Sequence, residues 1–185
     1  RTAGIVDKWS SIVHVNNYPK LDYQARMRRK GCLYCSNNLA IRSTVNPLKS
    51  DYLWNKAYLF QYSNDKYFSV WEVAPGGSTA LKGWTYYAGL NAYSWNTLRV
   101  TASSGSLKFY INSSLVWSGS DPTLTTGQVG IMMYRYNDSD TDPEQFLVDW
   151  AKLSTAVSSP AGDETLAEVG EEVTGWADYT RSPER

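Results

Sequence analysis

The side chains best suited to bind a metal lie in one acidic stretch. Asp138, Asp140, Asp142 and Glu144 occur at every second position. Carboxylate oxygens are the ligands that calcium prefers, although the stretch lacks the glycine and terminal glutamate of an EF-hand loop. A solvated acidic turn is the alternative, and the residue pattern favours it. Structural calcium is the only cofactor that we derive from these residues, and the solvated turn is favoured over it.

The two cysteines stand close together, in Cys32-Leu33-Tyr34-Cys35. A pair at this spacing can be a redox dithiol, half of a zinc site or a local disulfide. Zinc is disfavoured because the chain has a single histidine, His14, and no second cysteine pair. A thioredoxin-like role is disfavoured because the pair follows a basic strand and does not open a helix. We expect a disulfide in preference to free thiols, as in an exported protein.

Aromatic and polar residues suited to sugar binding recur in the expected strands. Eight tryptophans and fourteen tyrosines outnumber four phenylalanines, so most aromatic rings carry a polar group. Such a ring can stack on the apolar face of a sugar while arginine, glutamine or asparagine bonds its hydroxyls. Packing in the core or at an edge is the alternative for each. The candidate carbohydrate-binding residues are Arg42, Gln61, Trp71, Trp84, Tyr86 and Tyr134.

Patterns typical of catalysis are missing from the sequence. Glu72 is alone on its expected strand, and His14 has no Gly-x-Ser-x-Gly setting. No glycine-rich phosphate loop precedes a helix. We therefore expect a protein that is not an enzyme.

The net charge and the hydropathy of the sequence also exclude two classes of binding partner. The formal net charge is zero, with 18 basic and 18 acidic residues, which argues against nucleic acid. The best basic patch is Arg26, Arg28, Arg29 and Lys30, and a solvated strand end explains it equally well. No apolar run approaches the ~20 residues that a membrane span needs. We expect neither nucleic acid nor a membrane as the partner.

Strands must position most of these residues, because apolar and polar side chains alternate with a period of two along the chain. The cysteine pair and the acidic stretch are expected in loops. The clearest case of alternation is Leu98, Val100 and Ala102, followed after a Ser-Gly turn by Leu107, Phe109 and Ile111. With the strand after Asn112-Ser113, these runs predict an antiparallel meander. Strands are expected at 8–15, 21–28, 39–42, 56–62, 66–73, 81–88, 97–102, 107–112, 115–117, 128–136 and 146–153.

The segment from Trp95 to Gly130 resembles the concanavalin A-like, or laminin G-like, jelly-roll superfamily. It has a Trp-Asn opening, a Phe-Tyr-Ile-Asn strand, a Val-Trp strand, an Asp-Pro loop and a Gly-Gln-Val-Gly strand. The segment Phe146 to Leu153 resembles the closing strand of that fold. The resemblance covers roughly residues 8 to 154. It implies an all-β protein, an antiparallel two-sheet β-sandwich with jelly-roll topology.

The resemblance also bears on two sites. In glucanase-like relatives an acid on the last strand contributes to a structural calcium site, and Asp149 looks like that position. A strand pairing of Asp149 with a neighbour is the alternative. The Glu-x-Asp-x-x-Glu strand motif of the glucanase families does not occur here. The resemblance therefore implies the fold more strongly than an activity.

The composition changes after Ser154. Residues 155–185 carry seven acidic residues and two arginines. We expect residues 1–154 to form one concanavalin A-like domain and 155–185 an acidic C-terminal extension. The extension is expected to be flexible, or to dock on its own or a neighbouring subunit as an amphipathic segment or an added strand.

The leading functional hypothesis is non-catalytic recognition of a glycan, or of a cell-surface or extracellular protein, by a secreted module. The sequence begins at Arg1 without methionine, and we expect either a processed product or a segment of a longer chain. One alternative is a structural subunit of an extracellular assembly that exchanges a strand or its tail. A second is a glycoside hydrolase of the glucanase-like superfamily.

Overall fold

The structure is a computed structural model that describes residues 8–135, 145–155 and 176–178. Within these ranges every regular element is a β-strand. Consequently, in this part of the chain there is no helix long and apolar enough to cross a membrane. The strands are β1 (Lys8–His14), β2 (Leu21–Lys30), β3 (Asn37–Thr44), β4 (Lys56–Tyr62), β5 (Tyr67–Ala74), β6 (Gly77–Tyr86), β7 (Asn96–Ser103), β8 (Ser106–Ile111), β9 (Ser114–Ser120), β10 (Gln128–Arg135), β11 (Gln145–Ser154) and β12 (Trp176–Asp178).

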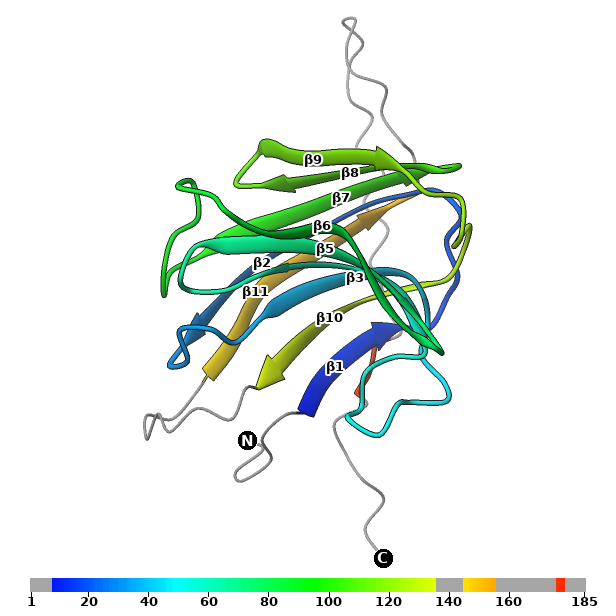
Figure 1. Ribbon diagram of the computed structural model, residues 1–185, viewed down its shortest axis with the longest axis horizontal. Helices are drawn as coiled ribbons and strands as arrows, with labels where there is room; N and C mark the ends of the chain where they lie inside the picture. Colours follow the sequence, from blue (N-terminus) through cyan, green and yellow to red (C-terminus); the bar gives the residue numbers. More distant parts are fainter. Residues whose placement is uncertain (1–7, 136–144, 156–175, 179–185) are drawn as a thin grey trace, which may run out of the picture.

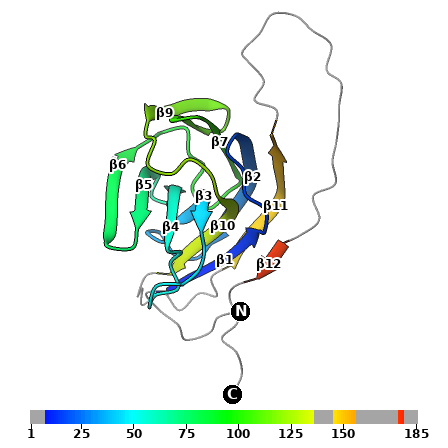
Figure 2. The ribbon, with the colours of Figure 1, turned by 90° about the vertical axis from the view of Figure 1, so that its right-hand side faces the viewer.

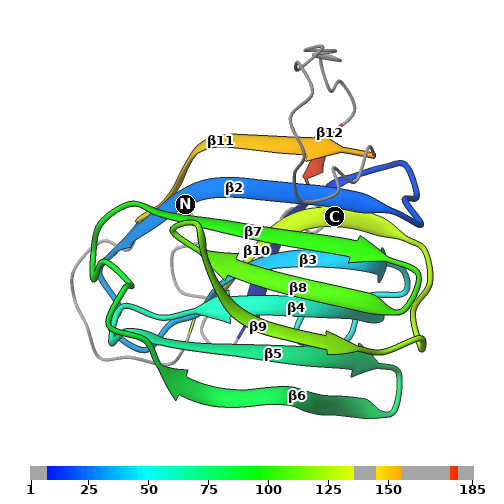
Figure 3. The ribbon, with the colours of Figure 1, turned by 90° about the horizontal axis from the view of Figure 1, so that it is seen from above.

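The strands form two antiparallel sheets stacked face to face (Figures 1 and 2). The large sheet has the order β12-β1-β10-β3-β4-β5-β6, and the small sheet has the order β11-β2-β7-β8-β9. Figure 3 shows the small sheet lying over the large one, with the strands of both running in similar directions. The predicted all-β, antiparallel two-sheet sandwich is confirmed.

The β7–β8–β9 meander is closed by two tight turns. Ser103 pairs with Ser106 and Ile111 pairs with Ser114, so each turn has two residues. Ser104, Asn112 and Ser113 all have positive φ, at 51°, 48° and 69°. Two-residue hairpins require this conformation at their central positions, where glycine and asparagine adopt it most easily. The turn residues of the sequence therefore fix the register of the small sheet.

The main core lies between the sheets and contains the apolar half of each alternating strand. On β2 the buried side chains are Tyr23, Ala25 and Met27, all fully inaccessible. Across the interface, the rings of Phe60 and Phe109 lie 4.9 Å apart. Strands with one buried face produce this alternation, so the outward positions of the small sheet remain polar.

A second apolar cluster lies on the opposite face of the large sheet, beneath the loop of residues 45–55, which we call the 45–55 loop. Trp54 is fully buried there with Val13, Ala40 and Met132 of the sheet. The Trp54 Nε1–H donates to Ser11 Oγ at 2.9 Å. A Cβ on Gly130 would lie 2.4 Å from the Trp54 ring, so only glycine fits there. This loop covers part of the outer face of the large sheet.

Strand β6 begins earlier than the sequence predicts. The expected strand spans 81–88, whereas β6 spans Gly77–Tyr86 and pairs with β5 from Ala74↔Gly77 onward. The turn is confined to Pro75 and Gly76. The Gly-Gly-Ser run breaks the apolar pattern because β6 is an edge strand whose first residues are exposed.

The C-terminal extension supplies β12, three residues that pair antiparallel with β1 (Figure 2). Its register aligns His14 with Trp176 and Ile12 with Asp178. The strand thereby occupies part of the edge of the large sheet. The rest of the extension lies outside the described residues.

Candidate functional site

The part of the large sheet's outer surface that the 45–55 loop leaves open carries aromatic rings around small polar side chains. We call it the aromatic face. Its members are Trp9, Asn38, Gln61, Tyr67, Ser69, Trp71, Trp84, Tyr86 and Tyr134.

Strand register brings these residues to one face. Trp9 lies opposite Tyr134, Asn38 opposite Gln61, and Gln61 opposite Ser69. Tyr67 lies opposite Tyr86 on the edge strand. Paired residues in neighbouring strands point the same way, at a strand spacing of about 4.8 Å. Residues from six strands consequently share one surface.

The floor of the aromatic face is polar and closely packed. Asn38, Gln61 and Ser69 are 0%, 7% and 0% exposed. The Asn38 amide nitrogen donates to Met132 O at 3.3 Å, while Asn38 Oδ1 is buried and accepts no hydrogen bond from the described residues. Unpaired buried acceptors are unusual, because each costs free energy when it leaves water. The floor thus has hydrogen-bonding capacity that the described protein groups leave unused.

Aromatic rings stand on both sides of this floor. At one side the Trp9 and Tyr134 rings lie 5.0 Å apart, and at the other the Tyr67 and Tyr86 rings lie 5.7 Å apart. Trp84 and Tyr86 are 44% and 57% exposed. Large rings left in water at a sheet surface are unusual when they cluster, and such clusters mark binding surfaces.

Trp71 connects the floor with the covered half of the sheet. Its Nε1–H donates to Ser69 Oγ at 3.0 Å, which fixes the plane of the indole. The same ring packs against the apolar cluster beneath the 45–55 loop. Trp71 is therefore held rigidly at the boundary of the aromatic face, and a rigid ring loses little entropy when it binds a ligand.

Five of the six residues predicted from the sequence lie on the aromatic face: Gln61, Trp71, Trp84, Tyr86 and Tyr134. Trp84 lies beside a bulge of β6, and its two-residue spacing from Tyr86 assigns it to this face. Arg42 does not lie on this face. Its guanidinium donates to Leu124 O at 2.9 Å and Pro19 O at 3.0 Å, and burial lowers its pKa. Arg42 ties two loops together at a bulge of β3, and we leave it out of the site.

Sequence reasoning missed Trp9, Asn38, Tyr67 and Ser69. The alternation Trp9, Ser11, Val13 carries the signal for Trp9, since Val13 packs outward under Trp54. Asn38 could not be found in this way, because β3 is buried on both faces and has no clear alternation. Register across β3, β4 and β5 is needed to place it.

The candidate metal ligands are only partly within the structure. Asp149 accepts a hydrogen bond from Arg26 Nη1 at 2.5 Å, and this ion pair joins β11 to β2 beside a bulge. Asp138, Asp140 and Asp142 lie outside the described residues. In the described ranges no three His, Cys, Asp or Glu side chains gather where they could hold an ion.

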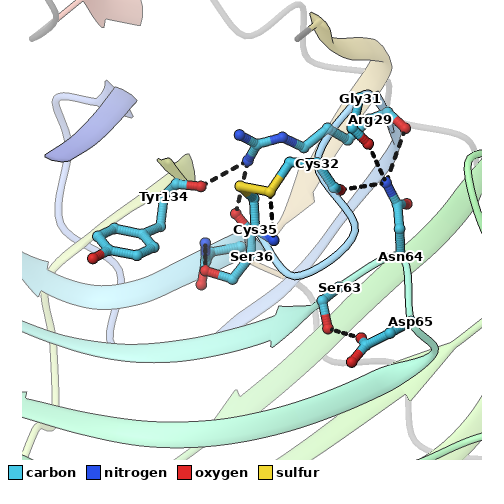
Figure 4. Close-up of a disulfide and its surroundings, with 10 residues drawn as sticks. Arg29, Gly31, Cys32, Cys35, Ser36, Ser63, Asn64, Asp65 and Tyr134 are labelled. Carbon is cyan, nitrogen blue, oxygen red and sulfur yellow. Dashed lines mark hydrogen bonds between the residues drawn. A yellow bond between two sulfur atoms is a disulfide. The ribbon is translucent and has the colours of Figure 1, made fainter. Parts of the chain in front are cut away.

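Cys32 and Cys35 form a disulfide in the loop after β2 (Figure 4). Both are fully buried. The Asn64 amide donates to the carbonyls of Gly31 and Cys32, at 3.4 and 3.0 Å. The Arg29 guanidinium donates to Tyr134 O at 2.8 Å, which connects this loop with the aromatic face. The disulfide loop is a structural support for the end of β10.

Two carboxylates interact at the other end of the sandwich. Burial raises the pKa of Glu72, and the charge of Asp121 adds to the rise. Burial also acts to raise the pKa of Asp121, but hydrogen bonds from Thr123 outweigh it and hold that pKa below its usual range. Glu72 lies on the inward side of β5, opposite Tyr58 on β4 and away from the aromatic face.

Solved structures similar to this chain include a carbohydrate-binding module, galectins and glycosyl hydrolases. Carbohydrate-binding module CBM66 from Bacillus subtilis has a TM-score of 0.63 at 14% identity, covering 80% of this chain and 83% of that one. Sheep galectin-11 has a TM-score of 0.53 at 6% identity, covering 81% and 98%. A beta-1,3-glucanase from Mycobacterium marinum has a TM-score of 0.52 at 16% identity, covering 78% and 67%.

The sequence itself matches no protein-family model and no curated protein. The structural likenesses are all far below 25% identity, so they establish the fold and leave the activity open. They include both binding proteins and hydrolases on the same framework. The chain therefore shares the two-sheet jelly-roll fold of these structures, which is the fold that its sequence resemblance implies.

Proposed function

We propose that this protein is a non-catalytic carbohydrate-binding module and that its aromatic face is the binding surface. The observation that carries the proposal is the cluster of exposed aromatic rings beside polar side chains on one sheet face. Trp84 and Tyr86 offer rings to the apolar side of a sugar. Gln61, which is 7% exposed, offers its amide group to a sugar hydroxyl.

The comparisons support this proposal. The structure named as a carbohydrate-binding module has a TM-score of 0.63, and the galectin has one of 0.53. The Cys32–Cys35 disulfide supports an extracellular, secreted location, because oxidising compartments preserve such bonds. A glycan of a cell surface or extracellular matrix is the partner that fits both the structural likenesses and a secreted location.

A glycan array tests the proposal with the full chain and the variants Trp84→Ala and Trp71→Ala. We expect selective retention of a subset of neutral glycans by the unchanged protein. Loss of Trp84 should weaken that retention about thirtyfold, which corresponds to the ~2 kcal/mol of a binding hot spot. Trp150→Ala, which removes a half-buried tryptophan on the small sheet, is the matched control and should leave retention unchanged.

Two results would overturn the proposal. One is a protein that retains no glycan, and the other is equal loss in the Trp84→Ala and Trp150→Ala variants. Release of reducing sugar from a retained polysaccharide, abolished by one carboxylate substitution, would replace it with the hydrolase alternative.

A second candidate function, strand exchange between copies in an extracellular assembly, is favoured by β12. The described residues of this strand, 176–178, pair with β1 and come from the acidic extension. An edge covered by a strand from such an extension can accept the same strand from another copy. Light scattering at rising concentration tests it: higher-mass species that vanish when residues 156–185 are deleted would support exchange, and a constant monomer mass would exclude it.

A further inference from the structure

The outer face of the small sheet carries an excess of positive charge that the neutral total conceals. Six basic side chains lie on it: Arg26, Arg28, Lys30, Arg99, Lys108 and Lys152. Two acidic ones, Asp22 and Asp149, accompany them. We call this surface the basic face. It lies on the opposite side of the sandwich from the aromatic face (Figure 2).

Both acids of the basic face are engaged by arginine. Asp149 pairs with Arg26, and Asp22 accepts hydrogen bonds from Arg99 Nε, at 2.7 Å, and from Arg99 Nη2. Among the described residues, Arg28, Lys30, Lys108 and Lys152 have no carboxylate partner. Within the described ranges these four positive charges are therefore not neutralised by a carboxylate.

Aromatic rings hold several of these cations in place. Arg26 and Arg28 both lie over the Trp95 ring, at 5.0 and 4.8 Å from its centroid. Lys152 lies 5.3 Å from the centroid of Trp150. Cation–π contacts restrict long side chains, so less conformational entropy is lost when an anion binds. The basic face is therefore partly pre-organised.

A hollow of about 140 Å³ on this face is lined by Gln24, Thr97, Arg99 and Ser113. Pockets for whole small molecules usually begin near roughly 300 Å³. This hollow suits one substituent of a larger ligand. Its lining combines a guanidinium with two hydroxyls and an amide, groups that bond both an anionic oxygen and a sugar hydroxyl.

We propose that the basic face is a second binding site, for an acidic polysaccharide whose sulfate or carboxylate groups contact the cations of β2, β7 and β11. Successive outward positions of β2 lie about 7 Å apart, so Arg28 and Lys30 present charges in a row along the strand. The site is independent of the aromatic face, because no residue is common to both.

Nucleic acid fits this surface less well. Single-stranded nucleic acid is bound by free aromatic rings that stack on bases. Here the Trp95 and Trp150 rings already stack against protein cations. The sequence pI of about 6.8 is also far from the pI above 9 typical of nucleic-acid-binding domains.

Titration calorimetry with the full chain tests the proposal, using heparin as a sulfated and polygalacturonate as a carboxylated polysaccharide. Dextran serves as the neutral probe and a single-stranded DNA oligonucleotide as the competing polyanion. The double variant Arg28→Gln/Lys152→Gln should weaken binding of an acidic polysaccharide about tenfold, roughly threefold for each charge removed. Lys56→Gln, which removes an exposed charge at the start of β4 in the large sheet, should change it less than twofold.

The variant Trp95→Leu tests whether binding needs arginines held in place by the Trp95 ring or only a positive net charge on this face. It removes no charge but releases Arg26 and Arg28, so we expect weaker polysaccharide binding with an unchanged melting temperature. Trp84→Ala should leave this binding intact even where neutral glycan binding is lost. The proposal is overturned by failure to bind either acidic polysaccharide, by equal effects of the Arg28/Lys152 and Lys56 variants, or by equally tight binding of DNA.

Discussion

The two outer faces of this sandwich differ although both belong to antiparallel sheets of the same core. On the large sheet, outward side chains are apolar beneath the 45–55 loop and aromatic beyond it. On the small sheet, they are charged and solvated, with arginines stacked on rings. The 45–55 loop buries part of the first face, whereas the outward side chains of β2 and β7 on the second face are all at least partly exposed.

This difference shows how one fold can offer two recognition chemistries. A loop packed on a sheet makes outward positions of β3 and β4 apolar, which leaves exposed rings only at the margin. A sheet without such a loop keeps the alternation of apolar inside and polar outside. The covering loop therefore determines where the aromatic face begins.

The largest expected effect comes from uncovering the large sheet. Trp54→Ala removes a fully buried indole and its hydrogen bond to Ser11, and we expect a loss of about 3–5 kcal/mol in unfolding free energy. Trp84→Ala, at an exposed position, should change it by about 0.5 kcal/mol or less. Urea unfolding measures both. A Trp54 effect below about 1 kcal/mol would mean that the loop does not bury the face.

The next effect tests whether the faces bind separately. Trp84→Ala should lower affinity for neutral glycan about thirtyfold and leave acidic polysaccharide binding unchanged, because its ring lies on the aromatic face. The Arg28→Gln/Lys152→Gln variant should show the reverse pattern, with the tenfold loss on the acidic ligand. Calorimetry with both ligands checks this. Parallel losses in either variant would show one continuous site or a global change in folding.

A smaller effect concerns the end of the sandwich between the two faces. Because the pKa of Glu72 is raised in the folded state, its ionisation costs stability, and that cost disappears as pH falls through the raised pKa. Glu72→Gln should therefore raise the melting temperature at pH 7 and lose this advantage near pH 4, the ordinary glutamate pKa of about 4.3.

Asp121→Asn is the matched variant with the opposite sign. The pKa of Asp121 is lowered on folding, so its stabilisation is present at neutral pH and lost as pH falls through that lowered pKa. The substitution should lower the melting temperature at pH 7. Equal shifts in the two variants would contradict the assignment of the pKa directions.

The smallest effect is expected from Asp149→Asn. The Asp149–Arg26 pair is about 40% exposed, and such pairs contribute about 0.2–1 kcal/mol. Stability should change little, while acidic polysaccharide binding should strengthen two- to threefold because Arg26 is released. If Asp149 instead holds a structural calcium ion, chelation with EDTA would lower the melting temperature of the unchanged protein and not of the variant.

Much of this fold could be predicted because alternation and turn chemistry are local. Ser104-Gly105 and Asn112-Ser113 identify the meander without knowledge of the rest. The aromatic face was harder to predict than the fold, because it depends on the register of strands that are far apart in sequence. Trp9 meets Tyr134 only through the pairing of β1 with β10. Arg42 looked like a ligand because its type suits sugar binding, and only the bulge of β3 reveals its two carbonyl partners.

The most direct test of the carbohydrate-binding surface is an NMR titration that follows the indole N–H signals of the eight tryptophans. The ligand is the neutral oligosaccharide with the strongest glycan-array signal. We predict that the signals of Trp84 and Trp71 shift with added sugar, while those of buried Trp54 and of Trp150 on the small sheet stay fixed. Shifts at Trp150 with none at Trp84 and Trp71 would contradict the assignment of the aromatic face.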